Sequence, residues 1–207
     1  MLTNIVKICT IPLFALISLS ATSQTYSLLI HDDVIEDFFK DLSKGLPHPI
    51  LKFNEEIMDW NEKDIYGEDD TLYQMGELTM GIMQIDSVRI FFTEKDLKYV
   101  LKQFDNLEGE RWYHEDFRKF EVIDTMDMQR ILSHSYSGKK MGKNYAYTFS
   151  VPLFSLNQEY AIIQQEFYCG LECETYCIYI YKQGGDKRSW NKVASWKCLS
   201  AGDKFRQ

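Results

Sequence analysis

The chain has 207 residues, of which 31 are acidic and 23 basic, so its net charge is −8 at neutral pH. This acidic balance disfavours binding to nucleic acid or to anionic membranes, because both require clustered lysine and arginine. Hydrophobic residues make up 45% of the chain and aromatic residues 14%, which is ample material for the core of one domain.

Residues 1–23 have the pattern of a secretory signal peptide. Lys7 is their lone charge, residues 8–19 are mostly apolar, and Ala21, Thr22 and Ser23 are small enough to precede a cleavage site. The apolar segment is shorter than the roughly 20 residues that cross a bilayer. We therefore expect export and cleavage near Ser23, with residues 24–207 in the periplasm or outside the cell and without a transmembrane segment. An uncleaved membrane anchor is the alternative.

Residues 24–132 are expected to be mainly helical. Apolar side chains recur at helical spacing between Asp33, the expected N-cap of a first helix, and Gly45. The best-defined helix begins after Thr93, where Leu97 and Leu101 belong to an i, i+3, i+4, i+7 apolar pattern. Weaker patterns predict a helix followed by a loop between residues 50 and 70, a helix over 72–83 and a helical turn over 126–132. They also predict an extended run over 88–92 and a short strand within 117–123.

Residues 144–200 change to a period of two, which is typical of strands. The alternation predicts strands over residues 145–151, 160–168 and 175–182 and a fourth from Trp190 to Trp196, with a hairpin signal at 184–186. The fold class predicted is α+β: N-terminal helices packed on a C-terminal antiparallel meander of about four strands, in a single domain.

Four of the five cysteines lie in this C-terminal half, at Cys169, Cys173, Cys177 and Cys198. In an exported chain they indicate two disulfides, for which three connectivities exist. A hairpin centred on residues 185 and 186 would place Cys173 opposite Cys198. Zinc binding and reactive thiols are the alternatives. The spacing C-x-x-x-C differs from that of redox sites, and three zinc ligands along one strand would splay apart.

The C-terminal pattern resembles a family of uncharacterised secreted proteins from Bacteroidetes-type bacteria. The residues that carry the resemblance are an aromatic strand, Val151-Pro152-Leu153-Phe154-Ser155, Tyr160-Ala161, Tyr168-Cys169-Gly170-x-x-Cys173, Trp190-x-Lys192-Val193 and Trp196-x-x-x-Ser200. The resemblance covers residues 90–200. It implies export, this sheet topology and a Cys169–Cys173 bridge, which leaves Cys177 to pair with Cys198. The chain departs from the family at Glu174, where glycine is expected, and at Cys198, where an aliphatic residue is expected. The resemblance implies no activity.

No catalytic, cofactor-binding or metal-binding residue is predicted, and no cofactor is expected. The chain lacks the G-x-S-x-G and H-E-x-x-H motifs, and its four histidines are separated in the sequence: His31, His48, His114 and His134.

The tyrosine-rich strands offer the one candidate binding surface. Tyr145, Tyr179 and Tyr181 are expected to form an exposed aromatic face for a protein or glycan ligand, with packing against the helices as the alternative. The sequence therefore favours an exported, non-catalytic binding or envelope-associated domain. A secreted hydrolase or thiol-redox enzyme is the other hypothesis, which a deep cleft that gathers a histidine with carboxylates or a free thiol would support.

Overall fold

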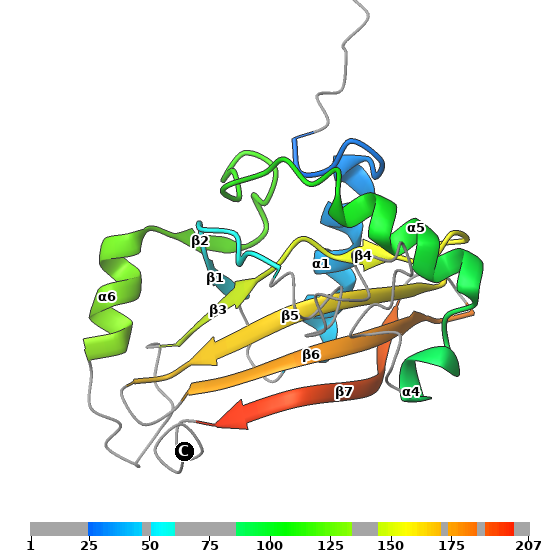
Figure 1. Cartoon of the computed structure of the whole chain (residues 1–207). Coiled ribbons are helices and arrows are strands. Elements are labelled where there is room, and N and C mark those ends of the chain that lie inside the picture. The colour runs from blue at the N-terminus through cyan, green and yellow to red at the C-terminus, as the bar shows by residue number, and fades with distance from the viewer. Residues whose placement is uncertain are drawn as a thin grey trace, which may run out of the picture.

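A computed structural model describes residues 25–46, 51–60, 86–133, 145–170, 174–185 and 189–200. Figure 1 shows the predicted α+β fold, in which helices lie against a twisted sheet. The helices are α1 (Asp32–Gly45), α4 (Asp86–Arg89), α5 (Glu94–Phe104) and α6 (Thr125–Ser133). The strands are β1 (Lys52–Asn54), β2 (Glu121–Ile123), β3 (Ala146–Phe149), β4 (Leu153–Phe154), β5 (Tyr160–Tyr168), β6 (Glu174–Gln183) and β7 (Trp190–Ser200).

The described strands form one mixed sheet in the order β2-β1-β3-β5-β6-β7, with β4 beside β5. Strands β5, β6 and β7 form the predicted antiparallel meander, and β3 joins it through β5. Two strands from the N-terminal half extend the sheet, because β1 pairs in parallel with both β2 and β3. The sequence pattern predicted helix instead of strand for β1, which is only three residues long.

Successive residues of β5 and β6 point to opposite faces of the sheet, as the period of two requires. Ile162 and Ile180 pack in a cluster with side chains of α5, whereas Ile163 and Tyr181 pack in a second cluster with side chains of α1. The two helices therefore cover opposite faces, which we call the α5 face and the α1 face. A smaller cluster holds Ile131 of α6 against β2 and β3.

The α1 face has a core of aromatic rings. Phe38 and Phe39 of α1 are fully buried, as are Phe53 of β1 and Phe149 of β3. Phe39 contacts both of these strand residues and also Trp112, with ring centroids 5.1–5.8 Å apart. Such pairs add to the stabilisation that burial of their area provides.

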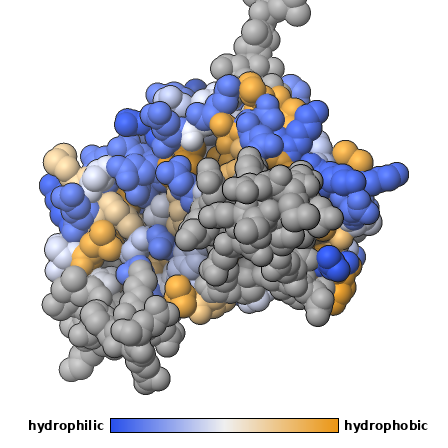
Figure 2. Space-filling model, in the orientation of Figure 1, coloured by the Kyte–Doolittle hydropathy of each residue, from blue (hydrophilic) through white to orange (hydrophobic). Residues whose placement is uncertain are grey.

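Aliphatic side chains predominate on the α5 face, with the rings of Trp60 and Phe92 among them, and buried polar side chains there are hydrogen-bonded to the backbone. Thr93 forms the predicted N-cap of α5, in a capping box with Asp96. Gln103, which is fully buried, donates from Nε2 to the carbonyl oxygen of Phe154 at 2.6 Å and accepts from the Phe154 backbone N–H at Oε1 at 2.9 Å. The indole N–H of Trp60 donates to the Val151 carbonyl at 2.8 Å. Figure 2 shows hydrophilic residues over the outward surface of α5.

Some local predictions were wrong at the ends of helices. Helix α1 has His31 at its N-cap position and no side-chain cap, and the carboxylate of Asp32, its first residue, accepts hydrogen bonds from the Thr25 and Tyr26 backbone N–H groups. The expected N-cap, Asp33, lies inside the helix. The expected extended run at 88–92 contains the end of α4 and a turn. Helix α6 and strand β2 lie where short elements were predicted, and the predicted helix at 72–83 lies outside the described residues.

The β6–β7 pairing determines which cysteines meet. Two irregularities shift the register, so Thr175 pairs with Ser200 while Tyr181 pairs with Lys192. Cys177 and Cys198 form a disulfide across these strands, with their Cα atoms 4.2 Å apart. The Cys177–Cys198 pairing is thus confirmed, and the hairpin register that placed Cys173 opposite Cys198 is wrong. Cys169 is disulfide-bonded as well, whereas Cys173 lies outside the described residues.

Candidate functional site

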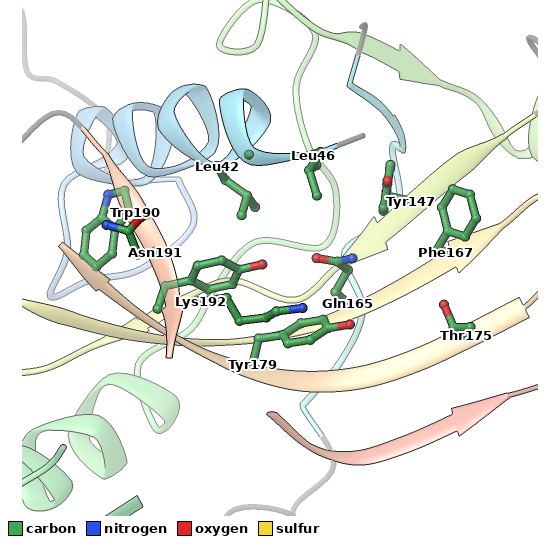
Figure 3. A pocket seen from close by; sticks show the side chains of 12 residues that line it. Leu42, Leu46, Tyr147, Gln165, Phe167, Thr175, Tyr179, Trp190, Asn191 and Lys192 are labelled. Carbon is green, nitrogen blue, oxygen red and sulfur yellow. The ribbon is translucent and has the colours of Figure 1, made fainter. Parts of the chain in front are cut away.

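A pocket of about 450 Å³ lies between the C-terminal end of α1 and the α1 face of the sheet. Its volume is within the range of about 300–1,000 Å³ that small-molecule sites occupy. We call it the tyrosine pocket, and Figure 3 shows the side chains around it. The described residues that line it are Leu42, Gly45, Leu46, Tyr147, Gln165, Phe167, Thr175, Tyr179, Tyr181, Trp190, Asn191 and Lys192.

Strand register brings the sheet residues of the pocket together. Tyr147 of β3 pairs with Phe167 of β5, which pairs in turn with Thr175 of β6, so these three side chains form a row on one face. Helix α1 ends at Gly45, and Leu46 after it has an extended backbone. The end of α1 therefore contributes only two apolar side chains, Leu42 and Leu46, above strands that present hydroxyl and amide groups.

Three tyrosine hydroxyls belong to this site. Burial raises the pKa of Tyr147, Tyr179 and Tyr181 above the ordinary value, and the proximity of the other tyrosines raises the pKa of Tyr147 and Tyr181 further. The hydroxyls therefore stay protonated at neutral pH. A protonated phenol both donates and accepts hydrogen bonds, so the pocket presents neutral groups of both kinds.

Among the described residues that line the pocket, Gln165 is the one with a buried side-chain polar atom that lacks a hydrogen-bond partner. Its side chain lines the pocket and is 8% exposed, yet its Oε1 atom is buried and finds no hydrogen-bond partner in the part of the chain that the structure describes. A buried acceptor without a partner costs about 1–3 kcal/mol. Such groups are uncommon in folded proteins, where nearly all buried polar atoms have a hydrogen-bond partner.

Lys192 supplies the positive charge of the pocket. Its Nζ atom lies 4.7 Å from the ring centroid of Tyr179. The side chain is exposed and takes part in none of the ion pairs among the described residues. None of the described lining residues is acidic, although the chain contains 31 acids.

The predicted aromatic face needs a correction. Tyr145 and Tyr181 are 5% and 6% exposed, and Tyr179 is half-buried, so the three do not form an exposed surface. They lie on the α1 face, where their rings pack against neighbouring aromatic residues. Tyr179 and Tyr181 nevertheless line the pocket. Gln165 was not among the predicted site residues, although it is the single polar residue in the series Ala161, Ile163, Gln165 and Phe167, which points to the α1 face.

The described residues do not form a metal site, a histidine-based catalytic site or a reactive thiol. Within the described ranges, no group of three or more histidine, cysteine or acidic side chains could hold a metal ion. His31 and His114 are both exposed, and His48 and His134 lie outside the described residues. Cys169, Cys177 and Cys198 are all disulfide-bonded. Among the helices that the structure describes, none is long and apolar enough to cross a membrane.

Comparison with protein-family models, with curated proteins and with solved structures finds no match to this chain. The resemblance to a secreted bacterial family stays a prediction.

Proposed function

We propose that the protein is an exported, non-catalytic binding domain and that the tyrosine pocket holds its ligand. The observation that carries this proposal is Gln165, whose side chain lines a pocket of ligand size while its buried Oε1 atom has no hydrogen-bond partner among the described residues. A ligand that donates to this atom would remove the cost of its burial.

The lining groups suit binding better than catalysis. Tyrosine hydroxyls with a raised pKa stay protonated and hold a ligand by hydrogen bonds, whereas a general base must accept a proton near the working pH. The apolar side chains of Leu42, Leu46 and Phe167 offer contact area beside the polar groups. This mixture of apolar lining and few polar groups is typical of small-molecule sites.

Two features support export. The apolar segment at residues 8–19 follows a lone lysine in the way that a signal peptide requires. The Cys177–Cys198 disulfide is suited to an oxidising compartment. An intact mass measured on protein recovered from the periplasm or medium should begin at residue 24. A mass that includes residues 1–23 would overturn cleavage.

Binding is tested with a library of small neutral and charged compounds, screened by ligand-detected NMR. The wild-type chain is compared with Gln165→Met, which keeps the side-chain length but removes the amide. We expect binders that are lost in Gln165→Met and retained in Gln103→Met, because Gln103 lies on the other face of the sheet. If no compound binds, or if both variants bind alike, the tyrosine pocket is not a ligand site.

A further inference from the structure

We infer that the ligand of the tyrosine pocket is a small carboxylate with a single negative charge that also carries a hydrogen-bond donor. This inference rests on the proposed function and specifies the class of ligand. It combines three features of the site: the ammonium of Lys192, the protonated tyrosine hydroxyls and the unsatisfied acceptor of Gln165. Figure 3 shows the side chains of Gln165, Tyr179 and Lys192 directed toward the same part of the pocket.

The negative charge is inferred from Lys192. Its Nζ atom is held over the ring of Tyr179 at 4.7 Å, at the wall of the pocket and not in an ion pair with a described residue. The acids of this strongly acidic chain are absent from the described lining. A ligand carboxylate there gains a charge-assisted hydrogen bond without repulsion from neighbouring carboxylates.

The tyrosine hydroxyls add donors for the same anion. Tyr179 and Tyr181 lie two residues apart on β6 and therefore point to the same face, with ring centroids 6.1 Å apart. Both hydroxyls keep their protons at neutral pH because burial raises their pKa. These neutral hydroxyls can donate hydrogen bonds to an oxyanion but add no positive charge. The single positive charge of Lys192 therefore matches a ligand with one negative charge.

The end of α1 limits the charge of the ligand. Gly45 and Leu46 bring the C-terminal end of this helix to the pocket. The C-terminus of a helix carries a partial negative charge from its unpaired carbonyl groups, which repels anions and attracts donors. This end of the helix would repel a phosphate dianion, and Lys192 would neutralise only one of its two charges. A carboxylate has a single charge, which Lys192 alone can neutralise.

The hydrogen-bond donor of the ligand is inferred from Gln165. Its Oε1 atom is a buried acceptor, so the ligand group beside it must carry an O–H or N–H. Hydroxy acids, sugar acids and amino acids with a free carboxylate all combine the two groups. Neutral sugars and simple fatty acids each lack one of them.

The test uses matched pairs in which a carboxylic acid is compared with its primary amide. We would use glucuronic acid and glucuronamide, mandelic acid and mandelamide, and N-acetylphenylalanine and its amide. Each pair keeps its shape and donor and differs in charge. Affinities are measured by NMR titration with the full mature chain. We expect at least one acid to bind the pocket, and its amide to bind about fivefold to tenfold more weakly.

Two lysine variants show whether the charge acts through the pocket. Lys192→Met keeps the apolar part of the side chain over Tyr179 and removes the ammonium, so it should weaken the acid about fivefold to tenfold and leave the amide unchanged. Lys182→Met is the matched control, because Lys182 lies over the ring of Tyr160 at 5.5 Å, outside the pocket lining. It should leave both affinities unchanged.

The outcomes separate this inference from the proposed function. The inference is overturned if an amide binds as tightly as its acid, or if Lys192→Met leaves the affinity for the acid unchanged. In either case, binding that is lost in Gln165→Met would still support the proposed function of the pocket. Failure of every acid also overturns the inference, and the neutral compounds of the wider screen then decide whether the pocket binds any ligand.

Discussion

The two faces of the sheet are made from the same strands, β5 and β6, but they satisfy their buried polar groups differently. On the α5 face, Gln103 and Trp60 are both buried and both hydrogen-bonded to backbone groups near β4. On the α1 face, Gln165 and Trp112 are buried, and each has one polar side-chain atom without a partner: Oε1 and Nε1, respectively. Among the described residues, these are the two buried side-chain atoms left in that condition.

This contrast separates structure from function within one domain. On the α5 face, the buried side chains of Gln103 and Trp60 are hydrogen-bonded within the protein, which stabilises the fold. The α1 face leaves an acceptor at the wall of a pocket, which costs stability unless a ligand is bound. Local inconsistency of this kind is expected at functional sites.

The largest effect should come from a charge in the α5 face. Leu101 is 5% exposed in the apolar cluster under α5, so Leu101→Asp loses about 1.5–3 kcal/mol of burial and adds an unpaired buried carboxylate. We expect no cooperative thermal unfolding by circular dichroism. Lys95→Asp, at an exposed position of the same helix, should unfold cooperatively near the wild-type temperature. A folded Leu101→Asp protein would contradict the role of α5 in the core.

The disulfide should have the next largest effect. Cys177 and Cys198 are 21 residues apart, so replacing both with alanine should lower the free energy of unfolding by about 2–4 kcal/mol. Cys177 pairs with Gln165 on the α1 face. The disulfide joins β6 to β7, so its loss should accelerate hydrogen exchange in these two strands more than in α5. Uniform acceleration over both faces would show that they unfold as one unit.

The smallest effect should come from the helix caps. Thr93→Ala removes the capping box of α5 and should cost about 1 kcal/mol in urea denaturation. His31→Ala at the N-cap position of α1 removes no side-chain cap hydrogen bond and should change stability by less than about 0.5 kcal/mol. Equal losses would mean that the two helix starts are stabilised alike.

The sequence predicted the α5 helix and the long strands because their periodicity extends over several turns or pairs. Strand β5 was predicted with its observed bounds, 160–168. Strands β1 and β4 were missed, since three and two residues are too few to show alternation and their pairing partners are distant in sequence. The N-cap of α1 was misplaced because the residue at that position, His31, makes no side-chain cap that a sequence motif would indicate.

The candidate site was only partly predictable. The tyrosines of β6 were recognised as functional candidates, but their burial depends on α1, whose position over the sheet the strand pattern does not give. Gln165 and Lys192 line the same pocket because β5 and β7 both flank β6. The two register irregularities between β6 and β7 could not be read from the turn sequence.

The measurement that tests the account most directly is the free energy of unfolding of Gln165→Met and Gln103→Met without ligand. Removing an unpaired acceptor should leave stability unchanged or raise it by up to about 1 kcal/mol in Gln165→Met. In Gln103→Met the loss of two backbone partners at Phe154 should cost about 1–3 kcal/mol. Equal destabilisation by the two substitutions would show that Gln165 is a structural residue and would contradict a pocket kept open for a ligand.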